Sequence, residues 1–213
     1  MLPAVKSLLT HSSVDRVYLL VEDLPFPYEL PERVTALNVS GFRAFDPQGP
    51  NYNCKWTYMV LMKTALPILF GQHDRMLCLD IDTIVMRNPD AIFDVDLDGY
   101  YLAAVHDTAR PADPEYINAG VMYMNLEAMR QDKKDVELIQ TLNTRKYTFC
   151  EQEAIHEFCH GRILRLPGEW NVSNWTDRPN QAPIIRHFAA EKDWFNDPLV
   201  QEWDAKPWPD GGR

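Results

Sequence analysis

Short apolar runs bounded by polar residues recur along the chain and predict buried β-strands. The expected strands span residues 16–21, 33–39, 76–79, 100–105, 117–125, 162–166 and 183–188. Between them, apolar positions with helical spacing predict helices over 2–11, 56–70 and most of 126–160. Strands interleaved with helices predict an α/β domain with a mostly parallel central sheet flanked by helices.

The length of 213 residues is enough for one domain with a sizeable core. We expect this domain to cover residues 1–205. The last segment, 206–213, is rich in proline and glycine and is typical of a linker. The chain is therefore expected to be one domain of a longer, multi-domain protein.

The formal net charge of -10 argues against nucleic acid or an anionic membrane as the main partner, because both favour a basic surface. The first residues lack a charged segment followed by a long apolar stretch, so no signal peptide is expected. The most apolar segment, 59–70, is interrupted by Lys63 and is too short to span a bilayer. These features favour a cytoplasmic protein.

The cysteines and glycosylation patterns fit the same compartment. The four cysteines contain no C-x-x-C pair, which favours reduced thiols over a disulfide framework. N-x-S/T patterns begin at Asn38, Asn171 and Asn174. Without a secretory route, we expect them to be chance matches.

Pairs of aspartates in the pattern D-x-D suggest metal binding, although the pattern alone is common by chance. Asp80 and Asp82 directly follow an expected buried strand, where alternation places both carboxylates on one side. Ligands of open α/β sheets bind at such strand ends. The overlapping matches at 94–98 lie in a polar stretch and are expected to be a solvated acidic loop.

Two carboxylates at a strand end suit Mg²⁺ or Mn²⁺, which prefer oxygen ligands and can also bind phosphate oxygens. The alternative role of Asp80 and Asp82 is to cap and turn the chain after the strand. The local sequence leaves both readings open.

A competing pattern, H-E-x-x-H, begins at His156 and is the signature of zinc hydrolases. It requires a continuous helix that carries His156 and His160 on one face. Gly161 follows at once and is expected to end the helix at His160. We therefore expect these to be surface or helix-capping histidines, with a zinc hydrolase kept as an alternative.

Four segments, in order, resemble glycosyltransferase family 8, which includes glycogenin. Residues 76–85, MLCLDIDTIV, resemble its "YLDxDxxV" segment, and 116–126, YINAGVMYMNL, resemble "FNAGVMLINL". Residues 151–153, EQE, are similar to "DQD", and 184–194, IIRHFAAEKDW, to "IIHFxGxxKPW". Lys63 stands where the family usually has an arginine directed toward the donor.

The resemblance implies a GT-A fold and a retaining enzyme that moves a hexose-type sugar from a UDP-sugar to a glycan or glycoprotein acceptor. The family's metal ligands, for Mn²⁺ or Mg²⁺, map to Asp80, Asp82 and His187. Its donor-binding positions map to Lys63, Asn118, Ala119, Gly120 and Lys192. Its carboxylate and amide groups near the reacting carbon map to Asp107, Glu151 and Gln152. A non-catalytic nucleotide-sugar binder would keep the same metal ligands.

The chain departs from the family pattern in several places. The family's glycine is Ala190 here and its proline is Asp193. The family's first strand, which carries much of the uracil pocket, has no counterpart in the sequence. The chain also resembles N-terminal glycosyltransferase domains of chlorella-virus proteins that build capsid glycans, which would imply a viral protein in the host cytoplasm.

Overall fold

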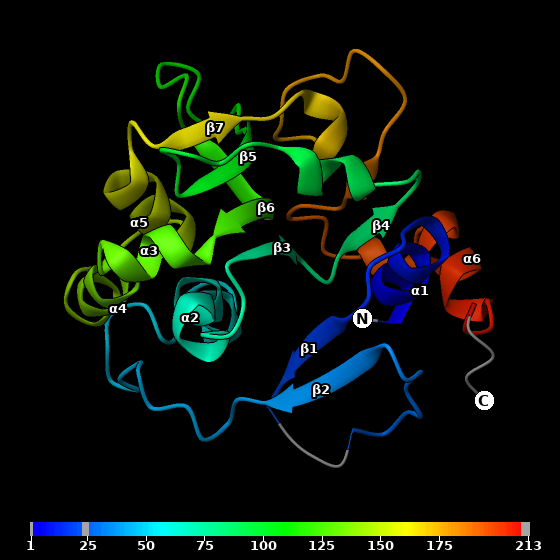
Figure 1. Cartoon of the computed structure of the whole chain (residues 1–213), viewed down its shortest axis with the longest axis horizontal. Helices are drawn as coiled ribbons and strands as arrows, with labels where there is room; N and C mark the ends of the chain where they lie inside the picture. Colours follow the sequence, from blue (N-terminus) through cyan, green and yellow to red (C-terminus); the bar gives the residue numbers. More distant parts are fainter. Residues whose placement is uncertain (1, 23–25, 210–213) are drawn as a thin grey trace.

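The computed structural model describes residues 2–22 and 26–209, and Figure 1 shows its elements. The helices are α1 (Leu2–His11), α2 (Met62–Leu69), α3 (Leu126–Gln131), α4 (Lys134–Thr144), α5 (Cys150–Cys159) and α6 (Pro198–Ala205). The strands are β1 (Val17–Val21), β2 (Val34–Asn38), β3 (Arg75–Leu79), β4 (Thr83–Val85), β5 (Leu102–His106), β6 (Ile117–Asn125), β7 (Ile163–Arg165) and β8 (Ile185–His187).

The strands form one central sheet and two smaller ones. The central sheet has the order β3-β6-β5-β7, while β1 pairs with β2 and β4 pairs with β8. In Figure 1 the β1–β2 pair lies apart from the central sheet, below α2 and β3 in that view. The α/β class and the flanking helices predicted from the sequence are confirmed.

The strand directions differ from the expected parallel sheet. Only β5–β7 is parallel within the central sheet, and β3–β6 and β5–β6 are antiparallel. A parallel pair needs a crossover long enough to return the chain to the same edge, usually a helix. The connection between β5 and β6, residues 107–116, contains no helix, so β6 runs back beside β5. The sheet is therefore mixed.

The main core lies between the central sheet and helices α2 to α5, which gather on one side of it (Figure 1). Met122 and Met124 of β6 are fully buried, as are Leu138 of α4 and Ile155 of α5. Burying an aliphatic side chain of this size contributes about 1.5–3 kcal/mol. This packing fixes β6, the strand whose first half carries the expected donor-binding residues.

A second packing unit joins the two ends of the chain. Helices α1 and α6 lie side by side next to β4 (Figure 1). The hydroxyl of Ser7 in α1 accepts a hydrogen bond from the Val85 backbone N–H at 3.0 Å. Trp208, within the expected tail, is buried in one apolar cluster with Val5 and Leu9. Packing thus continues to Trp208, and the boundary at residue 205 stays a prediction.

Most expected elements are present with bounds shifted by one or two residues. The expected helix over 56–70 is instead a 3-10 turn, Tyr58–Leu61, followed by α2. Strand β4 and helix α6 were not predicted. None of the helices described is long and apolar enough to cross a membrane.

Candidate active site

The segment Asp80-Ile81-Asp82 links β3 to β4 and is held by backbone hydrogen bonds at both ends. The Asp80 N–H donates to the Gly120 carbonyl at 2.8 Å, and the Phe188 N–H donates to the Asp82 carbonyl at 2.9 Å. The Thr83 hydroxyl donates to the Asp80 carbonyl at 2.7 Å. These bonds tie the segment to β6 on one side and to the end of β8 on the other.

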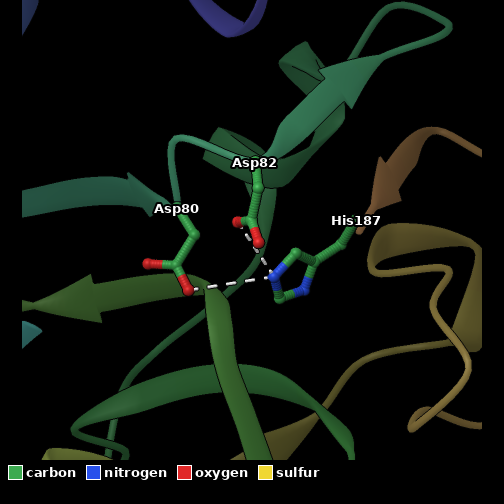
Figure 2. A group of neighbouring side chains, drawn as sticks. All are labelled: Asp80, Asp82 and His187. Carbon is green, nitrogen blue, oxygen red and sulfur yellow. Dashed lines mark ion pairs between the residues drawn. The ribbon is translucent and has the colours of Figure 1, made fainter. Parts of the chain in front are cut away.

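His187 reaches the aspartates because β8 pairs with β4, with Thr83 opposite His187. Its Nε2 atom lies 3.3 Å from Asp82 Oδ1 and 3.8 Å from Asp80 Oδ2, as the dashed lines in Figure 2 show. One donor atom from each residue lies within 4.8 Å of the others. Two carboxylates and an imidazole match the donor set of Mn²⁺ and related divalent ions. The three residues expected as metal ligands are therefore brought together.

The surroundings of Asp82 favour the ionised form of its carboxyl group. Burial would raise its pKa, but the hydrogen bond and charge of His187 outweigh burial, and the pKa is lowered overall. A metal ligand must be deprotonated, so this direction favours cation binding.

Lys63 of α2 lies beneath the aspartates and joins two predicted site residues. Its Nζ atom lies 2.7 Å from Asp80 Oδ1 and 3.1 Å from Glu151 Oε1. Burial would lower the Lys63 pKa, but the charges of Asp80 and Glu151 raise it overall, so the ammonium persists. Burial raises the pKa of Glu151, with Lys63 opposing that rise. Lys63 therefore holds Asp80 in place and compensates the charge of Glu151.

A third group of site residues forms a hydrogen-bonded cluster around Asp107, at the end of β5. Asp107 Oδ2 accepts from Asn118 Nδ2 at 2.9 Å and from Gln152 Nε2 at 3.2 Å. Asp107 Oδ1 accepts from the Ala109 N–H at 2.8 Å. Gln152 Oε1 accepts from the Ala119 N–H at 3.0 Å, which connects α5 to β6. Asp107, Asn118 and Gln152 thus form one connected unit.

These groups line a single large cavity of about 1160 Å³. Of the expected site residues, the following contribute to its wall: Lys63, Asp80, Asp82, Asp107, Asn118, Gly120, Glu151, Gln152 and His187. Ala119 and Lys192 do not. Lys192 is exposed on the loop after β8. Its expected contact with a diphosphate stays a prediction.

The cavity extends beyond the predicted site in two directions. Between the sheets it is lined by Leu20 of β1 and Met76 of β3, which belong to strands that pair on one side only in the described chain. Near Asp107 it is lined by Trp175, whose surface is 46% exposed. The cavity therefore has an apolar arm and an arm with an exposed aromatic ring.

Asn171 is a site residue that the sequence analysis did not identify. It follows the 3-10 turn Gly168–Trp170, is fully buried, and its Oδ1 atom lies 2.9 Å from His187 Nδ1. Its sequence context offers only the N-x-S pattern. A buried side chain with such contacts cannot be a glycosylation acceptor in the folded protein.

The H-E-x-x-H pattern and the acidic segment 94–98 do not line this cavity. Helix α5 ends at Cys159, with His160 as its cap and Gly161 at a φ of 75°, as the sequence predicted. His156 Nε2 contacts Asp113 at 2.8 Å and His160 Nε2 contacts Glu115 at 3.1 Å, so each histidine has its own carboxylate. His156 is buried rather than at the surface, because it packs edge-on against Tyr116. Asp94, Asp96 and Asp98 are exposed, as expected.

Comparison with known proteins identifies the family of the chain. The model of glycosyl transferase family 8 matches residues 21–197. The glycosyltransferase GlyA of Streptococcus pneumoniae serotype 4 is 30% identical over 223 residues, which cover 97% of this chain and 32% of GlyA. The chain spans about a third of the length of the curated relatives GlyA and GlyB that it matches.

Solved structures show the same fold at low identity. The glycosyltransferase GlyE of Streptococcus pneumoniae TIGR4 aligns with a TM-score of 0.74 and 20% identity, over 97% of this chain and 57% of GlyE. The galactosyltransferase LgtC, solved with donor and acceptor sugar analogs, aligns with a TM-score of 0.58 and 20% identity, over 81% of this chain and 73% of LgtC. These comparisons confirm the GT-A fold but not the expected chlorella-virus link. The chain belongs to glycosyltransferase family 8.

Proposed function

We propose that the chain is a metal-dependent, retaining glycosyltransferase that moves a hexose-type sugar from a UDP-sugar to a glycan or glycoprotein acceptor. The observation that carries this proposal is the convergence of Asp80, Asp82 and His187 within 4.8 Å at the wall of the large cavity. Family membership supports sugar transfer, and the donor set supports a divalent cation, Mn²⁺ or Mg²⁺.

Asp80, Asp82 and His187 would hold the metal, which would supply positive charge to the departing diphosphate. Lys63 keeps one oxygen of Asp80 engaged and leaves Asp80 Oδ2 directed toward His187. The exposed ammonium of Lys192 is proposed to reach the diphosphate as a second cation. These charges act on the leaving group, where negative charge develops during transfer.

The group below the reacting carbon is proposed to come from the Asp107, Glu151 and Gln152 region. Retention requires either a group on the face opposite the leaving group or attack guided onto the same face. Glu151 is a carboxylate, but Lys63 pairs with it; Gln152 is fixed by Asp107 and Ala119. Asn118 and Gly120, which line the cavity, would contact the sugar from the adjacent strand, and Ala119 would hold Gln152 through its backbone N–H.

Thermal-shift measurements with a panel of nucleotide sugars, with and without Mn²⁺, test donor and metal together. We expect stabilisation by UDP-sugars that requires Mn²⁺ and is lost in Asp82→Asn. Stabilisation by another nucleotide alone, or without metal, would contradict the proposed donor. Turnover separates an enzyme from a non-catalytic binder, which would bind but neither transfer the sugar nor hydrolyse the donor.

The stereochemistry is tested by NMR of the first-formed product. We expect the donor's anomeric configuration to be kept. If a covalent step operates through Glu151, Glu151→Gln should reduce turnover far more than Gln152→Ala. Modest losses in both variants would favour same-face attack. An inverted product would overturn the proposed mechanism, whatever the fold.

A further inference from the structure

A buried chain of hydrogen bonds runs from β6 through Asn171 to the candidate metal ligand His187. Asn171 Nδ2 lies 2.9 Å from Asn118 Oδ1, and Asn171 Oδ1 lies 2.9 Å from His187 Nδ1. Asn171 is 0% exposed and Asn118 is 5% exposed. Solvent therefore does not compete for these bonds.

The donor and acceptor sense of this chain is fixed at its first member. The Gly120 backbone N–H can only donate, and its partner at 3.1 Å is Asn118 Oδ1. The other end of that amide, Nδ2, then faces the Asp107 carboxylate at 2.9 Å, which can accept. A flipped Asn118 would place two donors together at Gly120 and two acceptors together at Asp107.

The same logic then fixes Asn171. Because Asn118 presents its oxygen, Asn171 must present its Nδ2 donor to it. The remaining atom, Asn171 Oδ1, is an acceptor and faces His187 Nδ1. A favourable bond at 2.9 Å requires a hydrogen on Nδ1.

We propose that Asn171 is a positioning residue that accepts a hydrogen bond from His187 Nδ1–H, so that Nδ1 keeps its hydrogen and the ring is held with Nε2 facing Asp80 and Asp82. In Figure 2 one ring nitrogen lies toward the two aspartates and the other lies away from them. A ring with a hydrogen on Nε2 alone would set two buried acceptors, Nδ1 and Asn171 Oδ1, against each other. It would also place a hydrogen where the metal is expected. The consequence for metal affinity rests on the metal role proposed above, whereas the hydrogen on Nδ1 does not.

The position of the ring proton is measured directly by NMR of the metal-free protein labelled with ¹⁵N-histidine. His187→Gln identifies the signals by their loss. We expect a proton on Nδ1, whether or not Nε2 also carries one beside Asp82. A His187 ring with a proton on Nε2 and none on Nδ1 would overturn the proposal. This measurement uses neither metal nor sugar, so it stands apart from the proposed function.

Substitution at Asn171 tests the link to metal binding. Leucine has a similar shape but no acceptor, so Asn171→Leu should lose the Nδ1 preference and bind Mn²⁺ about 10–100-fold more weakly. Asn171→Asp keeps an acceptor for Nδ1 but loses the donor to Asn118 Oδ1, so it should keep the proton on Nδ1 and recover only part of the affinity lost in Asn171→Leu. Asn143→Leu, which removes an amide bonded to Ala44 and Asp46, is the control and should keep wild-type affinity.

A folded Asn171→Leu with the wild-type ring proton and Mn²⁺ affinity would overturn the proposal. Circular dichroism and urea unfolding establish that the variant is folded. If it is not folded, the position of the His187 ring proton in the wild-type protein still decides. Failure of Mn²⁺ to bind the wild-type protein would instead contradict the proposed function.

Discussion

Gly120 lies where the imidazole of His187 crosses strand β6, and no side chain fits between them. A Cβ atom at this position would lie 2.0 Å from His187 Cε1 and 2.5 Å from Nδ1, far inside van der Waals contact. The family resemblance assigns this glycine to the sugar site. Its close approach to His187 shows that it also makes room for this proposed metal ligand.

Gly120→Ala should therefore displace the His187 ring and weaken Mn²⁺ binding by about ten-fold or more, as loss of a ligand's support does. Calorimetry with Mn²⁺ measures the change. Gly41→Ala is the matched control, because nothing lies within 4 Å of a Cβ placed there. Wild-type affinity in Gly120→Ala would contradict this account of the glycine.

The ionised carboxyl of Asp177 is expected to make the fold less stable in acid. Burial would raise the pKa of its carboxyl, but hydrogen bonds from Arg165 and His106 outweigh burial and lower the pKa. The unfolded carboxyl titrates near about 3.9, so the stabilisation is present above that pH and is lost as pH falls through the folded value. Asp177→Asn should cost about 1 kcal/mol at neutral pH.

Urea unfolding at pH 7 and at about pH 3 measures this difference between Asp177→Asn and the wild type. The difference should narrow in acid. If it stays constant or widens, Asp177 does not carry the effect.

The sequence identified Asp80, Asp82 and His187, the proposed metal ligands, but not Asn171, which contacts His187. Asp80 and Asp82 share a short pattern that follows an apolar strand, and His187 belongs to a recognisable segment. Asn171 lies 16 residues from His187 in the sequence. The two side chains meet because of how the fold arranges β6 and the 3-10 turn that precedes Asn171. A side-chain amide that supports another side chain has no characteristic spacing in a sequence, so only the structure reveals the contact between Asn171 and His187.

At the scale of secondary-structure elements, strand β4 and helix α6 were missed in the sequence analysis. Strand β4 is too short for alternation to identify, yet its pairing with β8 brings His187 to the aspartates. Helix α6 did carry a signal, because Asp197 caps it through the Leu199 N–H and Pro198 occupies its first turn. Sheet direction depended on the helix-free 107–116 connection, which an apolar pattern does not reveal.

The loop after β8 contains backbone strain at Ala190. Its φ is 60°, in the left-handed region that costs a residue with a Cβ atom about 1–2 kcal/mol. The family 8 segment has a glycine where this chain has Ala190. The replacement of that glycine by alanine therefore has a conformational cost. Ala190→Gly should raise stability by up to about 1 kcal/mol after the added freedom of the unfolded chain is subtracted.

Ala189→Gly is the matched control for this change. Ala189 is buried and lacks a positive φ, so glycine there should destabilise by about 0.5–1 kcal/mol. Thermal unfolding of both variants gives the comparison. Equal destabilisation by the two substitutions would show that the Ala190 backbone is not strained.

At the scale of the whole molecule, the candidate site joins parts that are otherwise separate. Asp80 follows β3 of the central sheet, while Asp82 and His187 are held by the β4–β8 pair. A third part, strand β1 of the β1–β2 pair, borders the apolar arm of the cavity.

Because its ligands come from two sheets, a bound Mn²⁺ should stabilise the folded chain as a whole. An ion that binds only the folded state adds about 2.7 kcal/mol at 100 times its Kd. For a chain of 213 residues this raises Tm by roughly 5–10 °C. Scanning calorimetry with increasing Mn²⁺ measures the shift. Asp80→Asn and Asp82→Asn each remove an anionic ligand and should abolish most of it, while Asp94→Asn in the exposed acidic loop should preserve it. A shift that survives both ligand substitutions would place the stabilising ion elsewhere on the molecule.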